Sequence, residues 1–323
     1  FKYTPPRNMN TTLIDSSSNG YGMWHSGTRP IDEYNGNWII SFRQYAGEAT
    51  THGQLASAFT DNIEDGNWTI YSNINANGHP PWGGGGVCED GTCAQARYPS
   101  AVASPNYPYI IWTEYTGGQT NLSLYGGRPY YTYDRLGWDG DEYIYPQDVD
   151  PFWQSTEADK WVGSAELSLR FPSNSHVINV AYQDWTRDKI YVHHSQIIED
   201  GHVIFNNEQS LFNLGSNSGD GPGPPSLSIN DAGQGAIGVV GVFLGNYYDS
   251  GGGQSEGEFI CENTISCNRI PIFKLTNDHG YTWYGPSDGS GDGYYFIPDN
   301  VFDDIFIKKI APNLIDTDTD GIG

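Results

Sequence analysis

The chain has 323 residues, and its 15 Lys and Arg against 39 Asp and Glu give a formal net charge of −24 at pH 7. This charge repels the phosphate backbone of nucleic acids, and no apolar run approaches the length of a membrane-spanning helix, so neither nucleic-acid binding nor membrane insertion is expected. The 41 Gly, 23 Tyr and 10 Trp favour turns and strands over helices. The composition therefore predicts an all-β chain that is long enough for a buried core.

The expected strands recur in groups of three along the chain. Each group opens with a segment around a proline and continues with two runs rich in β-branched and aromatic residues. The opening segments are residues 28–31, 97–104, 170–175 and 224–229. Second strands are expected at 37–42, 109–114, 178–184 and 236–243, and third strands at 54–59, 121–125, 189–194 and 270–273.

The four cysteines form two close pairs around short polar loops, Cys88 with Cys93 and Cys261 with Cys267. Two local disulfides are expected, and they imply an oxidising compartment, so the predicted location is extracellular or at the cell surface. The alternative is a zinc site built from all four thiols. The loose spacing within each pair and the acidic loops argue against that alternative.

Residues 276–283 read Thr-Asn-Asp-His-Gly-Tyr-Thr-Trp. Asp278 can accept hydrogen bonds from its own turn, Gly280 can adopt the positive φ that such a turn needs, and Trp283 can pack back against the hairpin. Together with Thr276 and Thr282, these residues match the Asp-box pattern [ST]-x-D-x-G-x-T-W. The chain thus resembles the Asp-box (BNR-repeat, sialidase-like) β-propeller superfamily, in which the box is a structural hairpin between the third and fourth strands of a blade.

The resemblance implies a single β-propeller with four-stranded antiparallel blades over residues 1–311. The repeated groups account for four blades, and residues 126–160 are expected to be the largest loop insertion. A fifth blade would combine residues 294–310 with 11–24, whereas the resemblance to sialidase-like proteins favours six blades. Both counts stay open at this point.

The same resemblance places the opening segments on the innermost strands, which line a central channel. Arg29, Arg97 and Arg170 are then expected side by side at one mouth of the channel. Sialidases hold a substrate carboxylate with three arginines, and the planar guanidinium suits that role because it binds carboxylates in a bidentate manner. The alternative is that each arginine pairs with one of the 39 acidic residues. The Arg-Ile-Pro signature of sialidases is missing, which weakens the enzyme interpretation.

No motif singles out a catalytic residue. Glu114 and Asp184 end expected strands, where an acid or a base of a glycosidase could stand. A lyase that uses His with Tyr could recruit His193 or His194. Adjacent strand residues point to opposite faces, so at most one of the two can face the channel, and an outward-facing polar role is the favoured interpretation.

Residues 312–323 form an acidic tail in which Asp316, Asp318 and Asp320 alternate before Gly321. This pattern resembles the calcium loops of EF-hands and thrombospondin type 3 repeats, so the tail is predicted to offer Ca²⁺ ligands and to begin a calcium-binding linker. No organic cofactor is expected, because the Gly-rich runs 83–86 and 251–253 lack the Lys and Ser/Thr of a phosphate-binding loop.

Two classes of function fit these features. The favoured class is a secreted or cell-surface module for recognition, adhesion or assembly, supported by calcium, whose partner is a glycan, another extracellular protein or a second copy of the chain. The alternative is a sialidase-like glycoside hydrolase or a polysaccharide lyase that acts on acidic glycans. The sequence does not decide between a binding module and an enzyme.

Overall fold

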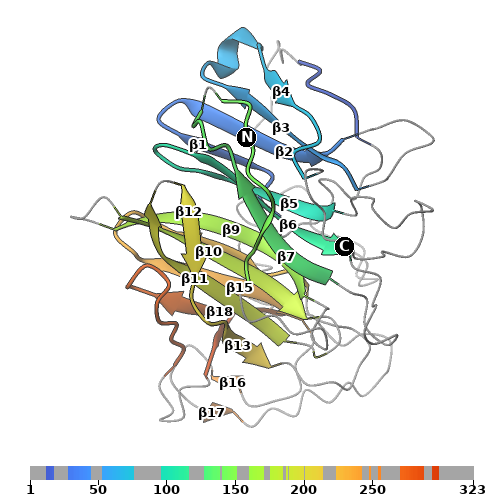
Figure 1. The fold of residues 1–323 in the computed structure, drawn as a ribbon. Coiled ribbons are helices and arrows are strands. Elements are labelled where there is room, and N and C mark those ends of the chain that lie inside the picture. The colour runs from blue at the N-terminus through green and yellow to red at the C-terminus, as the bar shows by residue number, and fades with distance from the viewer. Residues whose placement is uncertain are drawn as a thin grey trace, which may run out of the picture.

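The computed structural model describes residues 12–17, 28–44, 53–75, 96–115, 127–138, 140–150, 160–170, 175–184, 187, 189–199, 201–213, 223–241, 247–248, 254–255, 270–286 and 293–297. These residues form antiparallel sheets (Figure 1). A short 3₁₀ helix, η2 (Ile63–Asp65), lies in a connection between strands. None of the helices in the described part of the chain is long and apolar enough to cross a membrane.

The first two sheets are four-stranded meanders in chain order. The first consists of β1 (Ile31–Tyr34), β2 (Asn37–Arg43), β3 (Leu55–Thr60) and β4 (Thr69–Tyr71). The second consists of β5 (Ala96–Ala103), β6 (Pro108–Tyr115), β7 (Gly127–Tyr133) and β8 (Gln147–Asp148).

The third and fourth sheets repeat this plan with additions. The third consists of β9 (Lys160–Arg170), β10 (Ser175–Asp184), β11 (Lys189–Glu199) and β12 (His202–Phe205), and β13 (Gln209–Asn213) also pairs with β11. The fourth consists of β14 (Ser226–Ile229), β15 (Gly235–Gly241), β18 (Ile270–Thr276) and β19 (Tyr295–Phe296). A separate ribbon pairs β16 (Tyr247–Tyr248) with β17 (Gln254–Ser255).

The first strands of successive sheets lie side by side, which makes the arrangement a β-propeller. The backbone N–H of Arg29 donates to Ser100 Oγ at 3.1 Å, and this hydroxyl donates to the carbonyl of Gly163 at 3.2 Å. Leu227 N–H in turn donates to Ser164 Oγ at 2.8 Å. These bonds link the segment before β1 to β5, β5 to β9, and β9 to β14, so the sheets fan out from a common centre as blades (Figure 1). The predicted fold class is confirmed.

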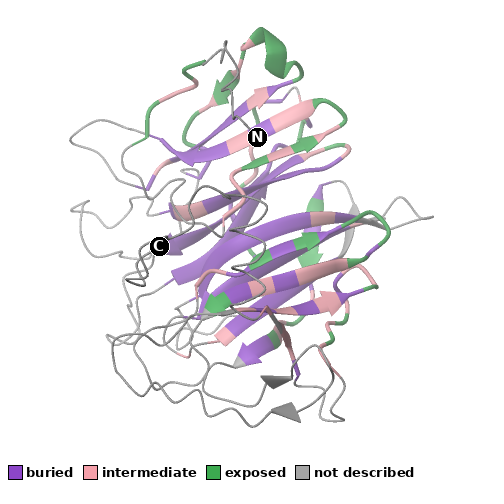
Figure 2. Ribbon diagram, turned by 180° about the vertical axis from the view of Figure 1, so that it is seen from behind, coloured by how far each residue is buried: buried purple, intermediate pink, exposed green. Residues whose placement is uncertain are grey.

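The core lies between neighbouring blades rather than within one layer (Figure 2). Aromatic and aliphatic side chains of the second and third sheets form one cluster, which includes Tyr109, Tyr131, Ile178 and Phe205. Similar clusters join the first sheet to the second and the third sheet to the fourth. Because the second and third blades bury both faces of their central strands, β6 and β10 are largely apolar runs, as expected for doubly covered sheets.

The opposite face of the fourth sheet carries a groove of about 460 Å³ lined by residues that include Val240, Pro271, Phe273 and Ile297. The predicted fifth blade would lie on this side. Tyr295 and Phe296, assigned above to that blade, instead form β19, the edge strand of the fourth sheet. The choice between five and six blades stays a prediction, as does the division at residue 311, because residues 298–323 lie outside the described part of the chain.

The expected second strands all match β2, β6, β10 and β15, but two expected strands were wrong. The third strand of the second blade is β7, which pairs with β6, and residues 121–125, expected in that place, lie outside the described residues. Pro129 concealed β7, because a proline argues against a strand inside a sheet. The first strand of the third blade is β9, not 170–175. The presumed insertion at 126–160 therefore contains β7, β8 and the start of β9.

The strand β9 escaped prediction because the hub of the propeller is crowded. A Cβ atom on Gly163 would lie 2.4 Å from the carbonyl oxygen of Pro225, which precedes β14. The centre of β9 is accordingly Gly163, Ser164 and Ala165, small residues that do not read as a strand from β-propensity.

Candidate functional site

The turn at residues 276–283 has the hydrogen bonds that its sequence predicts. One Asp278 carboxylate oxygen accepts from Thr276 Oγ1 and from the N–H of Thr282, each at 2.9 Å, and the other accepts from Thr282 Oγ1 at 2.6 Å. Gly280 has φ +83° and donates its N–H to Thr276 Oγ1 at 3.0 Å. Partial burial acts to raise the pKa of Asp278, but the hydrogen bonds, those from Thr282 first, outweigh it and lower the pKa below its ordinary value.

This turn has a structural role between blades. It joins β18 to the segment that leads to β19, and Trp283 packs against the core shared by the third and fourth sheets. His279 Nδ1 lies 2.6 Å from Ser168 Oγ, and the His279 carbonyl accepts from Asn179 Nδ2 at 3.0 Å, so the turn holds the fourth blade to the third. Membership of the Asp-box superfamily stays a prediction.

The structure does not bring the three predicted arginines together. Arg29 bonds Asp32 at 3.0 Å and also pairs with Glu166 of β9, which is the alternative foreseen from the abundance of acids. Arg170 ends β9, seven residues beyond Gly163, and Gly163 lies level with Ser100 of β5. At about 3.3 Å per strand residue, the backbone of Arg170 lies roughly 23 Å farther along β9 than Gly163.

Arg97 instead lies near Arg43, which the sequence did not single out, and Glu114 connects this pair to Arg128. We call this group the arginine cluster: Arg43 at the end of β2, Arg97 in β5, Arg128 in β7, with Tyr98 and Glu114. Glu114 pairs with Arg128 across β6 and β7, so their side chains share a face. The residues Arg43, Glu114 and Arg128 are buried, whereas Arg97 and Tyr98 are partly exposed.

The electrostatics of the cluster centre on Arg43, which is only 2% exposed. Burial, followed by the positive charge of Arg97, lowers the pKa of Arg43 to about 10, while Tyr98 and Glu114 act in the opposite direction. Glu114 accepts a hydrogen bond from Trp112 Nε1 at 3.0 Å. Arg128 bonds Asp148 at 2.6 Å. Three arginines against the carboxylates Glu114 and Asp148 leave a net positive charge here, in a chain whose overall charge is −24.

An irregularity in β5 presents Arg97 and Tyr98. The pairing with β6 shifts between Arg97 and Ser100, and Tyr98 has φ +55° in the left-handed region. Its ring packs edge-on against Trp161, with ring centroids 5.7 Å apart. Bulges and left-handed non-glycine residues cost energy, and they recur where a strand re-aims side chains at a functional site.

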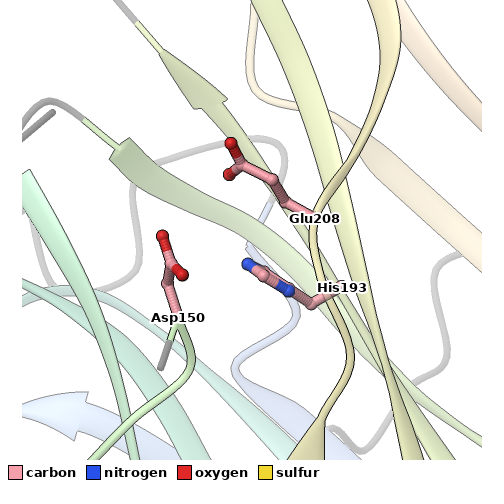
Figure 3. Close-up of side chains that lie close together, drawn as sticks. All are labelled: Asp150, His193 and Glu208. Atoms are coloured by element: carbon pink, nitrogen blue, oxygen red, sulfur yellow. The ribbon is translucent and has the colours of Figure 1, made fainter. Parts of the chain in front are cut away.

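A second cluster lies between the second and third blades (Figure 3). Asp150 follows β8, His193 lies in β11 and Glu208 lies between β12 and β13; one ligand atom of each lies within 4.8 Å of the others. These three residues could hold a metal ion. The ammonium of Lys160 donates to Asp150 Oδ2 at 2.8 Å and to Glu208 Oε2 at 2.7 Å, and Tyr182 Oη donates to Glu208.

The protonation states in this second cluster follow from burial and bonding. Burial acts to lower the pKa of Lys160, but hydrogen bonds to Asp150 and Glu208 outweigh it and raise the pKa, so the ammonium is retained. Burial lowers the pKa of His193. Burial and Glu208 raise the pKa of Tyr182 well above its ordinary value, so its hydroxyl keeps its proton.

His193 and His194 face opposite ways, as adjacent strand residues must. His193 stacks on Tyr182 between the second and third blades, whereas His194 contacts the Tyr281 ring of the fourth blade, with centroids 4.3 Å apart. Both are buried, so the expected outward-facing polar role is wrong for both. The four cysteines and Asp316, Asp318 and Asp320 lie outside the described residues, and the predictions for them stand untested.

Comparison with known proteins gives structural likenesses only. No family model matches the chain, and no curated protein matches it. The chain is similar to the catalytic domain of a GH62 α-L-arabinofuranosidase from Coprinopsis cinerea, at 11% identity and a TM-score of 0.40, over 87% of this chain and 74% of that one. It is also similar to polysaccharide lyase Uly1, at 11% identity and a TM-score of 0.44, over 88% of this chain and 59% of the lyase.

A third similar structure is a mutant of NanB sialidase from Streptococcus pneumoniae, at 13% identity and a TM-score of 0.39, over 64% of this chain and 25% of the sialidase. All three names are those of glycan-active proteins. At these values the likenesses assign neither a reaction nor a substrate to this chain.

Proposed function

We propose that this protein acts on a carboxylated glycan, which it binds at the arginine cluster. The observation that carries the proposal is the bulge of β5, which presents Arg97 and Tyr98 beside the buried Arg43. An acidic ligand would otherwise be repelled by a net charge of −24. A local concentration of guanidinium groups is the feature that such a ligand requires.

The cluster has the groups needed to hold and to activate such a substrate. Arg97 offers a planar fork to the carboxylate, and Arg43 adds positive charge behind it in a setting with little water, where charge–charge attraction is strong. Tyr98 and Glu114 supply a hydroxyl and a carboxyl group for proton transfer or nucleophilic attack. These groups suit hydrolysis through a tyrosine nucleophile, or elimination from a uronate whose carboxylate the arginines neutralise.

A glycan panel tests the proposal directly. The panel contains sialosides, polyuronates and uncharged polysaccharides, and the readouts are binding, new reducing ends and the ultraviolet absorbance of unsaturated uronate. We expect turnover of a carboxylated glycan alone. Reducing ends with the absorbance indicate elimination, and reducing ends without it indicate hydrolysis.

Substitutions separate the cluster from general charge effects. Arg97→Gln should weaken binding of the carboxylated glycan at least about tenfold, because a charge-assisted hydrogen-bonded pair contributes about 1.5–3 kcal/mol. The affinity of Arg97→Lys should lie between those of the natural chain and Arg97→Gln, since lysine keeps the positive charge but lacks the planar guanidinium fork. Arg135→Gln is the matched control, because Arg135 is exposed and pairs with Glu142 at the surface.

Each outcome has a definite meaning. Binding of a carboxylated glycan without turnover, lost in Arg97→Gln, supports the recognition module over the enzyme. Equal binding of charged and uncharged glycans, or no effect of Arg97→Gln, contradicts the assignment of the site.

The proposal includes export to the cell surface or the medium and a calcium-binding tail at Asp316, Asp318 and Asp320, as the sequence predicts.

A further inference from the structure

The second cluster contains a histidine whose ring is set up as a metal ligand. His193 Nδ1 lies 2.6 Å from the carbonyl oxygen of Asn206. A carbonyl can only accept, so Nδ1 carries the proton of the neutral ring and the lone pair is on Nε2. Histidines that bind metals commonly donate their second ring N–H to a backbone carbonyl in this way, which fixes the orientation of the ring.

Within the described part of the chain, no group forms a hydrogen bond with Nε2 of His193, and the residue is 0% exposed. Figure 3 shows the ring aimed towards the carboxyl groups of Asp150 and Glu208. An unsatisfied buried acceptor is costly, by about 1–3 kcal/mol.

A cation already binds the two carboxyl groups. Lys160 Nζ lies 2.8 Å from Asp150 Oδ2 and 2.7 Å from Glu208 Oε2, and it occupies the place between them that a metal ion would take. Metal–oxygen distances are shorter, about 2.0–2.2 Å for Zn²⁺. A metal would therefore draw the three ligand atoms closer than their present separation, which reaches up to 4.8 Å.

We propose that Asp150, His193 and Glu208 form a binding site for a divalent transition metal of the zinc class, in which the metal displaces the ammonium of Lys160. One imidazole nitrogen and two carboxylates are a donor set that suits Zn²⁺. Ca²⁺ instead requires six to eight oxygen ligands. Entry is through Glu208, whose side chain is 29% exposed, whereas Lys160 and Asp150 are enclosed.

The exchange of cations predicts how substitutions act. Lys160→Met keeps an unbranched chain of similar length and removes the competing ammonium, so zinc affinity should rise at least about tenfold over the natural chain. Without a cation the two buried carboxyl groups destabilise this variant, and zinc should raise its melting temperature more than that of the natural chain. His193→Phe keeps a ring against Tyr182 but removes the nitrogen ligand, and it should lower zinc affinity at least about tenfold.

The experiment uses the full chain, dialysed against a chelator and then titrated with ZnCl₂ in excess Ca²⁺. The calcium saturates all-oxygen sites such as the predicted one at Asp316, Asp318 and Asp320. We expect one zinc ion per chain by calorimetry, and visible absorption bands when CoCl₂ replaces zinc. Those bands report a low-coordinate site directly and need no enzymatic assay.

His194→Phe is the matched control, because His194 is adjacent in the chain but faces the fourth blade. It should leave zinc affinity unchanged, and Glu208→Gln should weaken it. Equal affinity of the natural chain, His193→Phe and Glu208→Gln places the zinc elsewhere and overturns the proposal. Binding by Lys160→Met alone also overturns it for the natural chain, because the lysine would then hold the site permanently.

Discussion

The link from Arg29 to Glu166 tests whether the described sheets surround a common axis. Arg29 precedes β1 of the first blade, and its guanidinium group forms ion pairs with Asp32 of β1 and with Glu166 of β9 in the third blade. The ion pair joins the first blade to the third, and the inner strands β1 and β9 both contact β5 of the blade between them. Arg29→Met removes the positive charge while keeping most of the stem of the side chain.

The magnitude follows from burial. Removing one partner of a buried ion pair costs about 3–5 kcal/mol, but the Arg29 side chain is 38% exposed, so solvent screens the loss. We expect a decrease of about 2 kcal/mol in the free energy of unfolding at pH 7. The destabilisation comes from Asp32 and Glu166, which would then be two partly buried carboxylates without the guanidinium group that pairs with them.

The loss should depend on pH with a known sign. Burial already raises the pKa of Asp32 and of Glu166, and Arg29 opposes that shift. A carboxyl group whose pKa is raised by folding costs stability above that pKa, and the cost disappears as the pH falls towards the unfolded value near 4. Without Arg29 the pKa values rise further, so most of the difference between Arg29→Met and the natural chain should vanish between about pH 7 and pH 4.

Urea denaturation across that pH range measures the difference, with the m-value checked for constancy. Arg135→Met is the matched control, because its partner Glu142 is exposed and a surface pair contributes about 0–1 kcal/mol. The reasoning is refuted if Arg29→Met is no less stable than Arg135→Met at pH 7, or if its deficit grows on acidification.

Two further substitutions test the hub and the 276–283 turn. Gly163→Ala should lower the free energy of unfolding by about 1–3 kcal/mol, because its Cβ would lie 2.4 Å from the Pro225 carbonyl oxygen. Gly238→Ala is the control and should cost less, because its Cβ would lie 3.3 Å from the nearest atom. Thermal melting compares the two variants, and equal losses of stability contradict the packing of β9 on β14. Asp278→Ala should cost about 1–2 kcal/mol through lost hydrogen bonds. Because folding lowers the pKa of Asp278, its contribution to stability is present above about pH 4 and is lost as the pH falls through the folded pKa. If Asp278→Ala and the natural chain lose stability equally on acidification, the Asp278 carboxylate does not stabilise the turn.

The parts of the fold that sequence predicted are those whose local pattern and spatial role agree. β6 and β10 are runs of β-branched and aromatic residues, and their burial on both faces demands such residues. β9 breaks the pattern because close packing at the hub selects Gly163 and its small neighbours. In the third blade, the Pro-Ser repeat therefore placed the expected first strand at 170–175, after the observed strand β9 (Lys160–Arg170).

The sites were harder to predict because they depend on pairing between distant segments. Arg97 was recognised from its position before a proline, but Arg128 becomes the neighbour of Glu114 only through the register of β6 with β7. Asp150 and Glu208 stand in connections between strands, where no motif marks them. One feature of the sequence could have indicated Arg43. It directly follows the expected strand 37–42, so it would lie at the same edge of the blades as Arg97, which begins an expected first strand.

The two proposed sites share no residue, so each can fail without the other. Glu114 shares a face with Trp112, which packs towards the first blade, whereas Thr113 points towards the third. Thr113 Oγ1 accepts from the N–H of Val162 at 2.7 Å and lies 3.4 Å from the Lys160 carbonyl, so it holds the start of β9. Thr113→Val should therefore weaken any effect of zinc on glycan binding that passes through this contact, and the packing of Tyr98 on Trp161 is a second contact between the sites. Coupling that survives Thr113→Val would require another route between the blades.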